Sequence, residues 1–247
     1  IRDVAPSRGL GDVYKRQKYH RSSTGGGRWE IRSLPESWLL HYKDDLTFHV
    51  KPMNFKHTGV FPEQAANWDY IREKGEGAGR PVRVLNLFAY TGGASLAACA
   101  AGADTTHVDS VKQVVTWARE NMELSGLDGI RWIVEDALKF VQREVRRGNR
   151  YHGIVLDPPA YGRGANGEKW ILEDNICEML ECCARLLEPR GAFLVLNLYS
   201  MGLSSTLART AVRQAFGAPR TEQYGELCFT DRAGKQLPLG TYYRFTR

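Results

Sequence analysis

The chain has 247 residues, of which 43% are hydrophobic and 25% are charged, and its formal net charge is +6 at pH 7. This balance is typical of a globular protein with one large domain, or with one domain and a small appendage. The sequence has no apolar run long enough to span a membrane and does not open on the apolar segment of a secretory leader, so we expect no membrane partner. The mild positive charge fits either a nucleic-acid partner or a basic surface that only water covers.

Cysteine usage gives a second, weaker indication. The five cysteines form no C-x-x-C pair and are Cys99, Cys177, Cys182, Cys183 and Cys228. An odd number without such a pair does not suggest a disulfide framework. We therefore expect reduced thiols, buried by default, in a cytoplasmic protein.

Residues 1–17 show neither helical nor strand periodicity, and they end on G-D-V-Y-K-R-Q, which resembles a translated sequencing adapter. We expect this segment to be a non-native or disordered tail without a function.

Residues 18–80 are expected to form a small N-terminal extension. Its first part, residues 18–28, is polar and rich in glycine, which is typical of a loop. The segments W-L-L-H-Y and L-T-F-H-V then flank the triplet K-D-D, which predicts a β-hairpin. A helix is expected over residues 63–74 and a glycine-rich linker over residues 75–81.

From residue 81 onward, apolar strands alternate with helices, a pattern typical of a parallel sheet with helices on both faces. Strands are expected over residues 82–88, 105–109, 130–136, 152–157 and 192–197. Helices are expected over residues 95–101, 111–125, 137–147, 171–189 and 204–216. Two closing strands around residues 231–234 add an antiparallel hairpin. The fold class predicted for residues 81–247 is α/β, with a mostly parallel sheet of seven strands.

The first junction between a strand and a helix reads N-L-F-A-Y-T-G-G-A-S, residues 86–95. In a doubly wound sheet, ligands bind beyond the carboxyl ends of the strands, where the N-terminus of the next helix offers N–H groups. Gly92 and Gly93 would let the backbone approach such a ligand, although a tight turn requires glycine in any case. The dinucleotide-binding pattern G-x-G-x-x-G is absent here.

An aspartate stands at the end of each of the next two strands. Asp109 follows the first strand by about two dozen residues, where a carboxylate can accept hydrogen bonds from both hydroxyls of a ribose. Asp136 stands where a carboxylate can accept from the exocyclic amine of adenine. Either aspartate alone is better explained as a helix N-cap. Both together, after a Gly-Gly turn, favour a nucleoside ligand.

The fourth strand ends in D-P-P-A-Y, Asp157 to Tyr161. Pro158 and Pro159 fix φ and remove two N–H donors, so that nearby carbonyl groups can face a substrate. Tyr161 is then placed to stack on a planar base. Two structural alternatives stay open, because the prolines can simply stop the strand and Tyr161 can pack against Phe61 in the core.

Together these motifs resemble the class I S-adenosylmethionine-dependent methyltransferases, whose domain is Rossmann-like. Five segments in this order are similar to the bacterial family that contains the large-subunit ribosomal RNA cytosine-C5 methyltransferases and their uncharacterised relatives: K-H-T-G-V-F-P-E-Q-A-A-N-W, N-L-F-A-Y-T-G-G-A-S, V-D-S-V-K, V-E-D-A-L-K-F and D-P-P-A-Y-G-R-G. The resemblance covers residues 19–247 and implies S-adenosyl-L-methionine as the cofactor.

The resemblance also implies which residues bind this cofactor. Asp109 would hold the ribose and Asp136 the adenine. The pocket would be lined by Phe88, Tyr90, Thr91, Gly92, Gly93, Asp109, Ser110, Asp136, Ala137 and Asp157. The segment that covers the cofactor in the relatives matches Lys56, Thr58, Phe61 and Gln64. Those relatives usually carry more sequence before position 18, and the cytosine enzymes carry an RNA-binding PUA domain in that region.

One departure from the family concerns the chemistry. The cytosine-C5 enzymes need a thiolate that attacks the ring, and in them this cysteine follows the fifth strand. Here the corresponding turn, residues 197–202, reads N-L-Y-S-M-G and contains no cysteine. Cys183 shares a helix face with Ile176 and Leu187, which predicts a position in the core. We therefore expect direct displacement, without a covalent intermediate.

The sequence thus predicts methyl transfer from S-adenosylmethionine to a nitrogen or oxygen acceptor, with ribosomal RNA as the partner. The residues expected at the acceptor site are Asp157, Pro158, Pro159 and Tyr161. No metal is expected, because the histidines lack the spacing of metal ligands. Two alternatives stay open, namely methylation of a protein or small molecule, and a non-catalytic module that binds the cofactor or RNA. The acceptor atom and the oligomeric state are not predicted.

Overall fold

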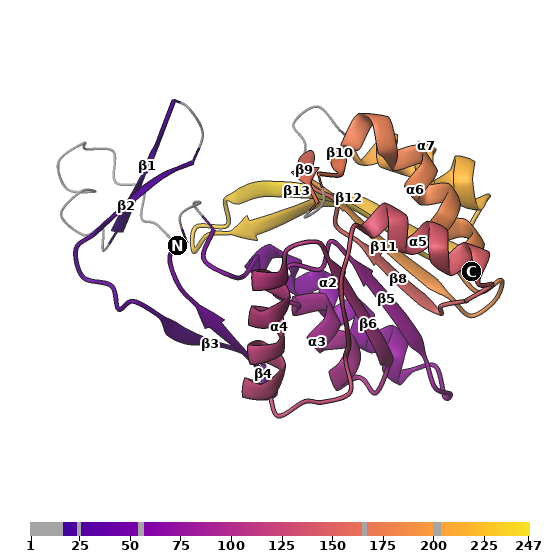
Figure 1. Cartoon of the computed structure of the whole chain (residues 1–247), viewed down its shortest axis with the longest axis horizontal. Coiled ribbons are helices and arrows are strands. Elements are labelled where there is room, and N and C mark those ends of the chain that lie inside the picture. The colour runs from indigo at the N-terminus through magenta and orange to yellow at the C-terminus, as the bar shows by residue number, and fades with distance from the viewer. Residues whose placement is uncertain (1–16, 24–25, 54–56, 165–166, 200–203) are drawn as a thin grey trace. The chain divides into compact units, whose positions relative to one another are not determined.

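The computed structural model describes residues 17–23, 26–53, 57–164, 167–199 and 204–247 (Figure 1). The chain divides into two compact units, Ile1–Phe61 and Pro62–Arg247. Except for Gln17, the tail expected over residues 1–17 lies outside the described residues.

The first unit contains two antiparallel hairpins. They are formed by β1 (Gln17–Arg21) with β2 (Gly27–Ile31) and by β3 (Trp38–Tyr42) with β4 (Leu46–Val50). The predicted hairpin around K-D-D is confirmed, and Lys43 in its turn adopts the left-handed conformation with φ of 52°.

The prediction of a loop over residues 18–28 is wrong for β1 and for the start of β2. In this hairpin Tyr19 faces Trp29, with ring centroids 5.1 Å apart. His20, which pairs with Arg28 in the register, contacts Glu30 diagonally through a hydrogen bond of 2.9 Å. These cross-strand contacts stabilise a strand whose own sequence has only one large apolar residue, so that no alternating pattern indicates it.

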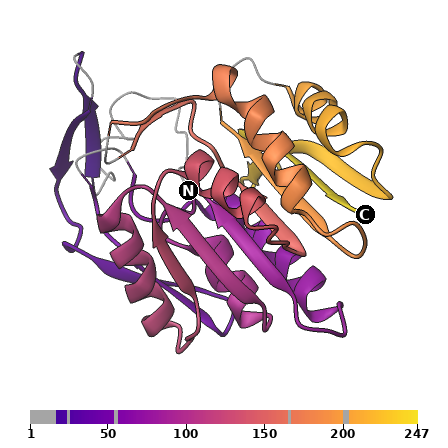
Figure 2. The ribbon, with the colours of Figure 1, turned by 45° about the vertical axis from the view of Figure 1, so that its right-hand side comes forward.

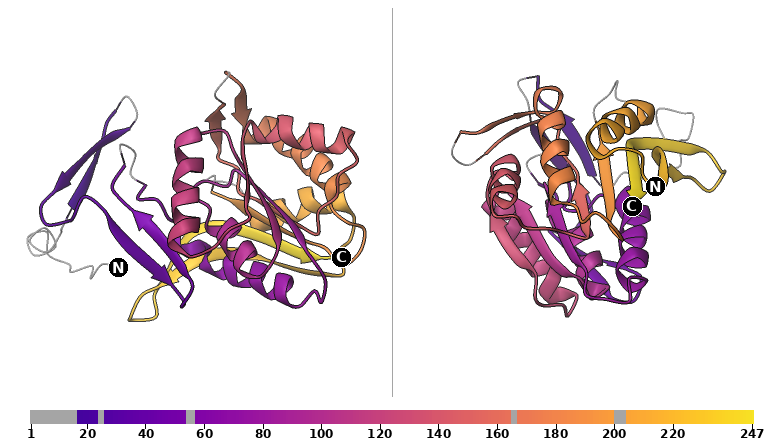
Figure 3. Two further views of the ribbon diagram at one scale, coloured as in Figure 1. Left: turned by 60° about the horizontal axis from the view of Figure 1, so that its bottom comes forward. Right: turned by 90° about the vertical axis from the view of Figure 1, so that its right-hand side faces the viewer.

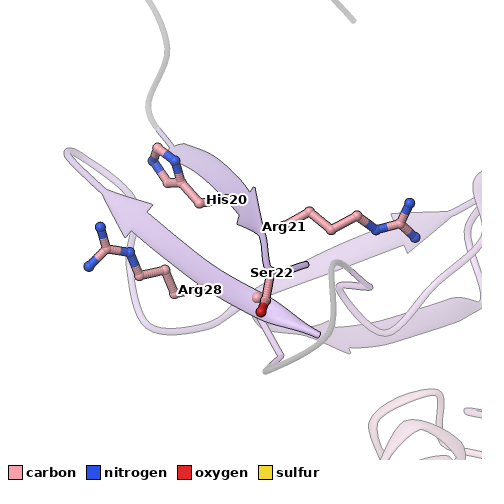
Figure 4. Close-up of a pocket in the computed structure, with 5 residues that line it drawn as sticks. His20, Arg21, Ser22 and Arg28 are labelled. Carbon is pink, nitrogen blue, oxygen red and sulfur yellow. The ribbon is translucent and has the colours of Figure 1, made fainter. Parts of the chain in front are cut away.

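A shallow hollow on the first hairpin is lined by His20, Arg21, Ser22, Gly27 and Arg28. In Figure 4 the guanidinium groups of Arg21 and Arg28 extend in opposite directions, away from one another. The two cations therefore do not converge on a single ligand.

The second unit contains the remaining elements. Its strands are β5 (Arg83–Leu87), β6 (Asp104–Asp109), β7 (Arg131–Val134), β8 (Gly153–Leu156), β9 (Tyr161–Arg163), β10 (Lys169–Ile171), β11 (Phe193–Leu198), β12 (Thr221–Thr230) and β13 (Gln236–Thr246). Its helices are the 3₁₀ turn η1 (Pro62–Gln64), α2 (Ala65–Glu76), α3 (Gly93–Ala100), α4 (Lys112–Leu124), α5 (Ala137–Arg146), α6 (Leu172–Leu186) and α7 (Ser205–Phe216).

Seven of these strands form one sheet in the order β12-β13-β11-β8-β5-β6-β7 (Figure 2). The five strands from β11 to β7 run parallel, whereas β13 is antiparallel to both of its neighbours. The predicted α/β fold with a mostly parallel seven-stranded sheet is thus confirmed. After β5, the chain adds β6 and β7 next to one edge of this strand and later adds β8 next to its other edge. The switch in strand order therefore lies between β5 and β8.

Alternating side chains of the central strands build a core on each face of the sheet. Leu85 and Leu87 of β5 pack with residues of α5, α6 and α7. Val84, which precedes Leu85 in β5, packs with residues of α2 and α3 on the opposite face. Figure 3 shows helices on both faces of the sheet. Because the side chains of a strand alternate between faces, a fully apolar strand must be covered on both.

The small hairpin of β9 and β10 was not expected from the sequence. It follows the Asp-Pro-Pro segment, and Trp170 of β10 pairs with Gly162 of β9 in its register.

Within the described residues, no helix is both long enough and apolar enough to cross a membrane.

Candidate active site

The carboxyl ends of the parallel strands carry the residues that the sequence singled out. The loop after β5 turns sharply, and Phe88 and Tyr90 adopt positive φ values of 55° and 48°. This conformation is unfavourable for residues other than glycine and persists only where neighbours enforce it. Here the amide of Ala89 donates to the carbonyl of Val108 at 3.1 Å, which fastens the loop to the end of β6.

The two glycines that follow are required by packing as well as by any ligand. Gly92 has φ of 91°, and a Cβ atom there would lie 2.9 Å from Leu96. A Cβ atom on Gly93 would lie 2.6 Å from the ring of Trp68. Helix α3 therefore packs so closely that the Gly-Gly turn has a structural reason of its own.

Asp109, at the end of β6, is held from two directions. Its Oδ2 accepts from the amide of Tyr90 and its Oδ1 from the amide of Val111, each at 2.9 Å. Burial raises the pKa of this carboxyl, while the backbone N–H groups lower it. The N-cap residue of α4 is Val111, so Asp109 is not that helix cap. Each carboxylate oxygen can accept a further hydrogen bond, which leaves acceptor capacity for hydroxyl groups.

Asp136, by contrast, is the N-cap residue of α5. Its Oδ1 accepts from the amide of Lys139 at 2.9 Å. The capping explanation therefore applies to this aspartate. Its predicted contact with adenine stays a prediction, as do those of the neighbouring Ser110 and Ala137. Thr91 is buried, and the amide group of Asn121 donates to its carbonyl at 3.0 Å.

Asp157 follows β8, next to the switch in strand order. Its Oδ1 is buried and has no hydrogen-bond partner among the described residues. Burial, followed by the negative charge of Glu63, raises the pKa of this carboxyl from 3.8 to about 7. A carboxylate that is desolvated and unpartnered is costly to hold, and such groups cluster at functional sites.

The two prolines after Asp157 do not present an open row of carbonyl groups, as the sequence suggested. The indole of Trp170 donates to the carbonyl of Pro159 at 2.7 Å, and its ring lies 4.8 Å from that of Phe88. Pro158 is buried and Pro159 is exposed. Trp170 thereby links the hairpin of β9 and β10 to the loop after β5, a connection that no local pattern predicts.

Tyr161 lies on β9 with 52% of its surface exposed. The alternative that it packs in the core is therefore wrong, and Trp170 takes the interior position instead. The Tyr161 hydroxyl accepts from Nε of Arg163 at 2.8 Å. The hairpin thus presents an aromatic ring and a cation side by side at the surface.

A buried polar network joins the start of α2 to the end of β11. Asn67 donates to Oε1 of Gln64 and to Oδ1 of Asn197, both at 2.9 Å, and Asn197 donates to Oε1 of Gln64 at 3.1 Å. The amide of Gln64 also donates to the hydroxyl of Tyr199. Asn67, Asn197, Tyr199 and Glu63 were missed from the sequence, where the only indication was their polar character beside an apolar strand and helix.

The segment predicted to cover the cofactor is described only in part. Lys56 lies outside the described residues. Thr58 and Phe61 belong to the first compact unit, where the ring of Phe61 lies 5.1 Å from that of His57. Gln64 belongs to the second unit and is buried in the polar network. Cofactor contacts of these residues stay a prediction.

The cysteines are free thiols, and three of them are poorly suited to act as nucleophiles. Cys183 is fully buried, as predicted, and burial raises its pKa. Burial also raises the pKa of Cys99 and of Cys182. A raised pKa lowers the fraction of reactive thiolate. Among the described residues, no group of three or more histidine, cysteine or acidic side chains is placed to hold a metal ion.

Comparison with known proteins identifies the family. A model of the S-adenosylmethionine-dependent methyltransferase family matches residues 5–227. The chain belongs to this family. The SAM-dependent methyltransferase from Agrobacterium tumefaciens, known from its crystal structure, is 40% identical to it. That match has a TM-score of 0.89 and covers 95% of this chain and 78% of the other.

Two further relatives extend the comparison. The ribosomal RNA large subunit methyltransferase K/L of Shewanella frigidimarina is 31% identical over 172 residues, which cover 68% of this chain and 22% of the relative. The chain therefore spans less than a quarter of that relative's length. The methyltransferase SMU.776, complexed with SAH, has a TM-score of 0.68 at 19% identity and covers 88% of this chain and 58% of the other. This last likeness shows the fold alone.

The residues present fit the cofactor of this family, S-adenosylmethionine. Asp109 stands at the end of β6 with both oxygens oriented by backbone N–H groups, which suits hydroxyl donors such as those of a ribose. The N-terminus of α3 begins at Gly93, directly after the strained loop. Asp157 adds a buried, unpartnered oxygen beside this edge.

Proposed function

We propose that this methyltransferase acts on ribosomal RNA by direct displacement at a nitrogen or oxygen acceptor, without a covalent intermediate. One observation carries this proposal, namely that two features lie together at the carboxyl ends of the neighbouring strands β8 and β11. The described end of β11 presents Tyr199 and no cysteine, while the neighbouring end of β8 presents the unpartnered oxygen of Asp157. A cationic methyl donor needs no activation by a nucleophilic enzyme group, so alignment and exclusion of water suffice.

Residues at the carboxyl ends of different strands would bind the cofactor and the acceptor. When bound, S-adenosylmethionine supplies the electrophilic methyl group. Asp109 would hold the ribose and Asp136 the adenine, with the loop from Phe88 to Gly93 around the rest of the cofactor. Asp157 would accept a hydrogen bond from the acceptor group and so orient its lone pair.

Tyr161 would hold the acceptor base by stacking. Its exposed ring and the adjacent guanidinium of Arg163 form a surface of the kind that binds unstacked bases and phosphates. This role explains why an aromatic residue stands exposed directly after the Asp-Pro-Pro segment, where packing does not require one.

Ribosomal RNA is proposed as the substrate because a relative carries that name and because the chain is basic. The formal net charge is +6, of which residues 1–17 contribute +2 and the rest of the chain +4. The first hairpin bears Lys18, Arg21 and Arg28. Such residues bind phosphates without reading sequence. With ribosomal RNA as the substrate, the location that we propose for the protein is the cytoplasm.

The decisive experiment transfers labelled methyl groups to two acceptors in parallel. One is total ribosomal RNA from a strain in which the gene has been deleted, and the other is protein from the same lysate. Label in RNA supports the proposal, and mass spectrometry of nucleosides then identifies the modified atom. Label in protein alone would favour the alternative substrate class. A chain that binds S-adenosylmethionine but labels neither acceptor would act as a binding module.

A further inference from the structure

The hairpin of β9 and β10 has two faces of different character. Its strands have three residues each, and in their register Trp170 lies opposite Gly162. Because side chains alternate along a strand, these two residues form one face of the hairpin. Glycine has no side chain, so this face consists of the ring of Trp170, which is buried. The other face carries Tyr161, which is exposed, and Arg163, whose Nε donates to its hydroxyl.

The segment that leads into the hairpin has few backbone donors of its own. At the end of the ladder between β5 and β8, the amide of Asp157 donates to the carbonyl of Leu87 at 3.4 Å. Pro158 and Pro159 follow, and neither has an N–H group. Their carbonyl groups can still accept. Hydrogen bonds that hold this part of the segment therefore have to come from donors elsewhere in the chain.

Trp170 supplies such a donor. Its indole N–H donates to the carbonyl of Pro159 at 2.7 Å, and the amide of Leu172 donates to the carbonyl of Ala160 at 3.0 Å. The ring of Phe88 packs on the same indole, with centroids 4.8 Å apart and an angle of 57° between the planes. One buried side chain thus contacts both the segment after β8 and the loop after β5.

The tip of the hairpin is also tied to α5. Glu168, directly before β10, forms an ion pair of 2.7 Å with Lys139, and more than half of the Lys139 side chain is exposed. Exposed ion pairs contribute little to stability, because water and salt screen them. We therefore expect the buried contacts of Trp170, rather than this ion pair, to fix the position of the hairpin.

We propose that Trp170 is a positioning residue for methyl transfer, which sets the spacing between the cofactor loop and the acceptor segment. It acts through Phe88 and Pro159, not through contacts of its own with the cofactor or the acceptor. Phe88 begins the loop assigned to the cofactor, and Pro159 stands two positions after Asp157, which is assigned to the acceptor. The inference rests on the proposed function, because that function makes these two assignments.

Direct displacement depends on this spacing. The acceptor lone pair forms the bond to the methyl carbon while the bond from that carbon to sulfur breaks, and the electrons of that bond stay on the sulfur. The positive charge passes to the acceptor, which releases a proton to water if it carries one. Acceptor atom, carbon and sulfur have to lie in line, and a misplacement of about 1 Å can lower the rate by roughly 100-fold. A relative shift of the two segments should therefore lower turnover more than the affinity for either ligand.

Two changes remove the indole N–H and keep an aromatic ring in place. One is Trp170→Phe, and the other replaces Trp170 with benzothienylalanine, in which sulfur takes the place of the N–H and the volume is preserved. We expect each to lower kcat by about 10–100-fold, while KM for the acceptor and Kd for S-adenosylmethionine stay within about two-fold of wild type. If Trp170→Phe does not fold, the benzothienylalanine protein decides the question.

Trp117→Phe is the matched control, because Trp117 of α4 is buried to the same extent as Trp170. It should lower the melting temperature as Trp170→Phe does and leave kcat of the folded protein unchanged. A purely structural role of Trp170 would give the same result in both variants. The ratio of kcat to KM and Kd therefore separates positioning from packing.

A second measurement needs no acceptor. In a ¹H–¹⁵N NMR spectrum, the indole signal of Trp170 is identified by its absence from Trp170→Phe. Its hydrogen bond to Pro159 should slow the exchange of this proton with water. Saturation with S-adenosylhomocysteine should shift the signal, because Phe88 of the cofactor loop packs on the ring.

Three results would overturn the inference: a kcat close to wild type in both Trp170 variants, a loss of kcat that Trp117→Phe reproduces, or an indole signal that does not respond to S-adenosylhomocysteine. Turnover is measured with whichever acceptor the wild-type protein labels, RNA or protein. Label in protein alone would defeat the proposed substrate, and the same kinetics would still decide the role of Trp170. A wild-type protein that labels neither acceptor would refute both proposals.

Discussion

Two aspartates at the same edge of the sheet have opposite environments. Asp109, after β6, accepts backbone hydrogen bonds on both oxygens, each at 2.9 Å. Asp157, after β8, is partly buried, and its buried Oδ1 has no partner among the described residues. A carboxylate oriented by fixed donors is suited to binding, since its geometry is set before the ligand arrives. A carboxylate without donors is poised to change its protonation state, since burial disfavours its charge.

Removing the unpartnered carboxyl group of Asp157 should have the largest effect on activity. We expect Asp157→Ala to lower turnover by roughly 10²–10⁴-fold, the range for a group that takes part in proton transfer. Affinity for S-adenosylmethionine should stay within a few-fold of wild type. Steady-state kinetics on RNA give the turnover, and calorimetry gives the affinity for the cofactor. Equal losses of turnover and affinity would contradict separate roles for Asp157 and Asp109.

Removing the oriented carboxyl should affect binding instead. We expect Asp109→Ala to weaken S-adenosylmethionine binding by about 1.5–3 kcal/mol, the range for hydrogen bonds to a charged group. Asp104→Ala is the matched control, because Asp104 lies exposed at the other end of β6 and should leave affinity unchanged. Unchanged affinity in a folded Asp109→Ala variant, measured by calorimetry, would remove this residue from the site.

The proposed role of Tyr161 in binding the acceptor base can be tested separately. Loss of its ring should raise KM for RNA by the equivalent of about 1–3 kcal/mol, the value of stacking on one base. Because the residue is half exposed, Tyr161→Ala should leave the melting temperature nearly unchanged. Tyr161→Phe keeps the ring and loses the hydrogen bond from Arg163, so its KM should remain close to wild type. A lower melting temperature with an unchanged KM would speak for packing alone.

The raised pKa of Asp157 makes a prediction for stability. The folded protein disfavours the ionised carboxyl, so stability should be lost as pH rises from 3.8 through about 7. Asp157→Asn abolishes this ionisation, and its melting temperature relative to wild type should therefore increase by a few degrees between pH 4 and pH 8. Thermal unfolding of both proteins across this range is the measurement. A difference that stays constant with pH would show that Asp157 ionises normally.

The smallest effect is expected from the cysteines. Replacing all five by alanine or serine should leave methyl transfer measurable, provided that circular dichroism shows a folded protein. The reason is that burial raises the pKa of three thiols and that none of the five occupies the described end of β11. Loss of activity in a folded Cys99→Ala or Cys228→Ser variant, together with a covalent RNA adduct in the wild type, would restore a thiolate mechanism.

The sequence predicted the sheet well because its central strands are apolar on both faces. Strands such as β8 and β11 can be read without knowing their neighbours, and the alternation with helices then determines their parallel arrangement. β1 could not be read in this way, since its stability comes from the cross-strand contact of Tyr19 with Trp29. Short hairpins depend on such pairs more than on their own composition.

Site residues that belong to local sequence motifs were predicted individually. Site residues that come together from distant segments of the chain were missed. Asp109 and Asp157 stand at strand ends that the sequence reveals. The network of Gln64, Asn67 and Asn197 joins residues 130 or more positions apart, so no spacing indicates it. The same is true of Trp170, whose bond to Pro159 determines which ring lies inside and leaves Tyr161 at the surface.

The strained loop after β5 also has a consequence for the order of folding. Phe88 and Tyr90 have positive φ values, and the loop is held by two hydrogen bonds, from the amide of Ala89 to the carbonyl of Val108 and from the amide of Tyr90 to the carboxylate of Asp109. Those acceptors belong to β6, which pairs in parallel with β5 across the intervening helix α3. The loop therefore cannot settle by itself, and we infer that it becomes ordered late, once both strands have docked in parallel. A partly folded chain would then hold much of its secondary structure and still be unable to recognise its cofactor.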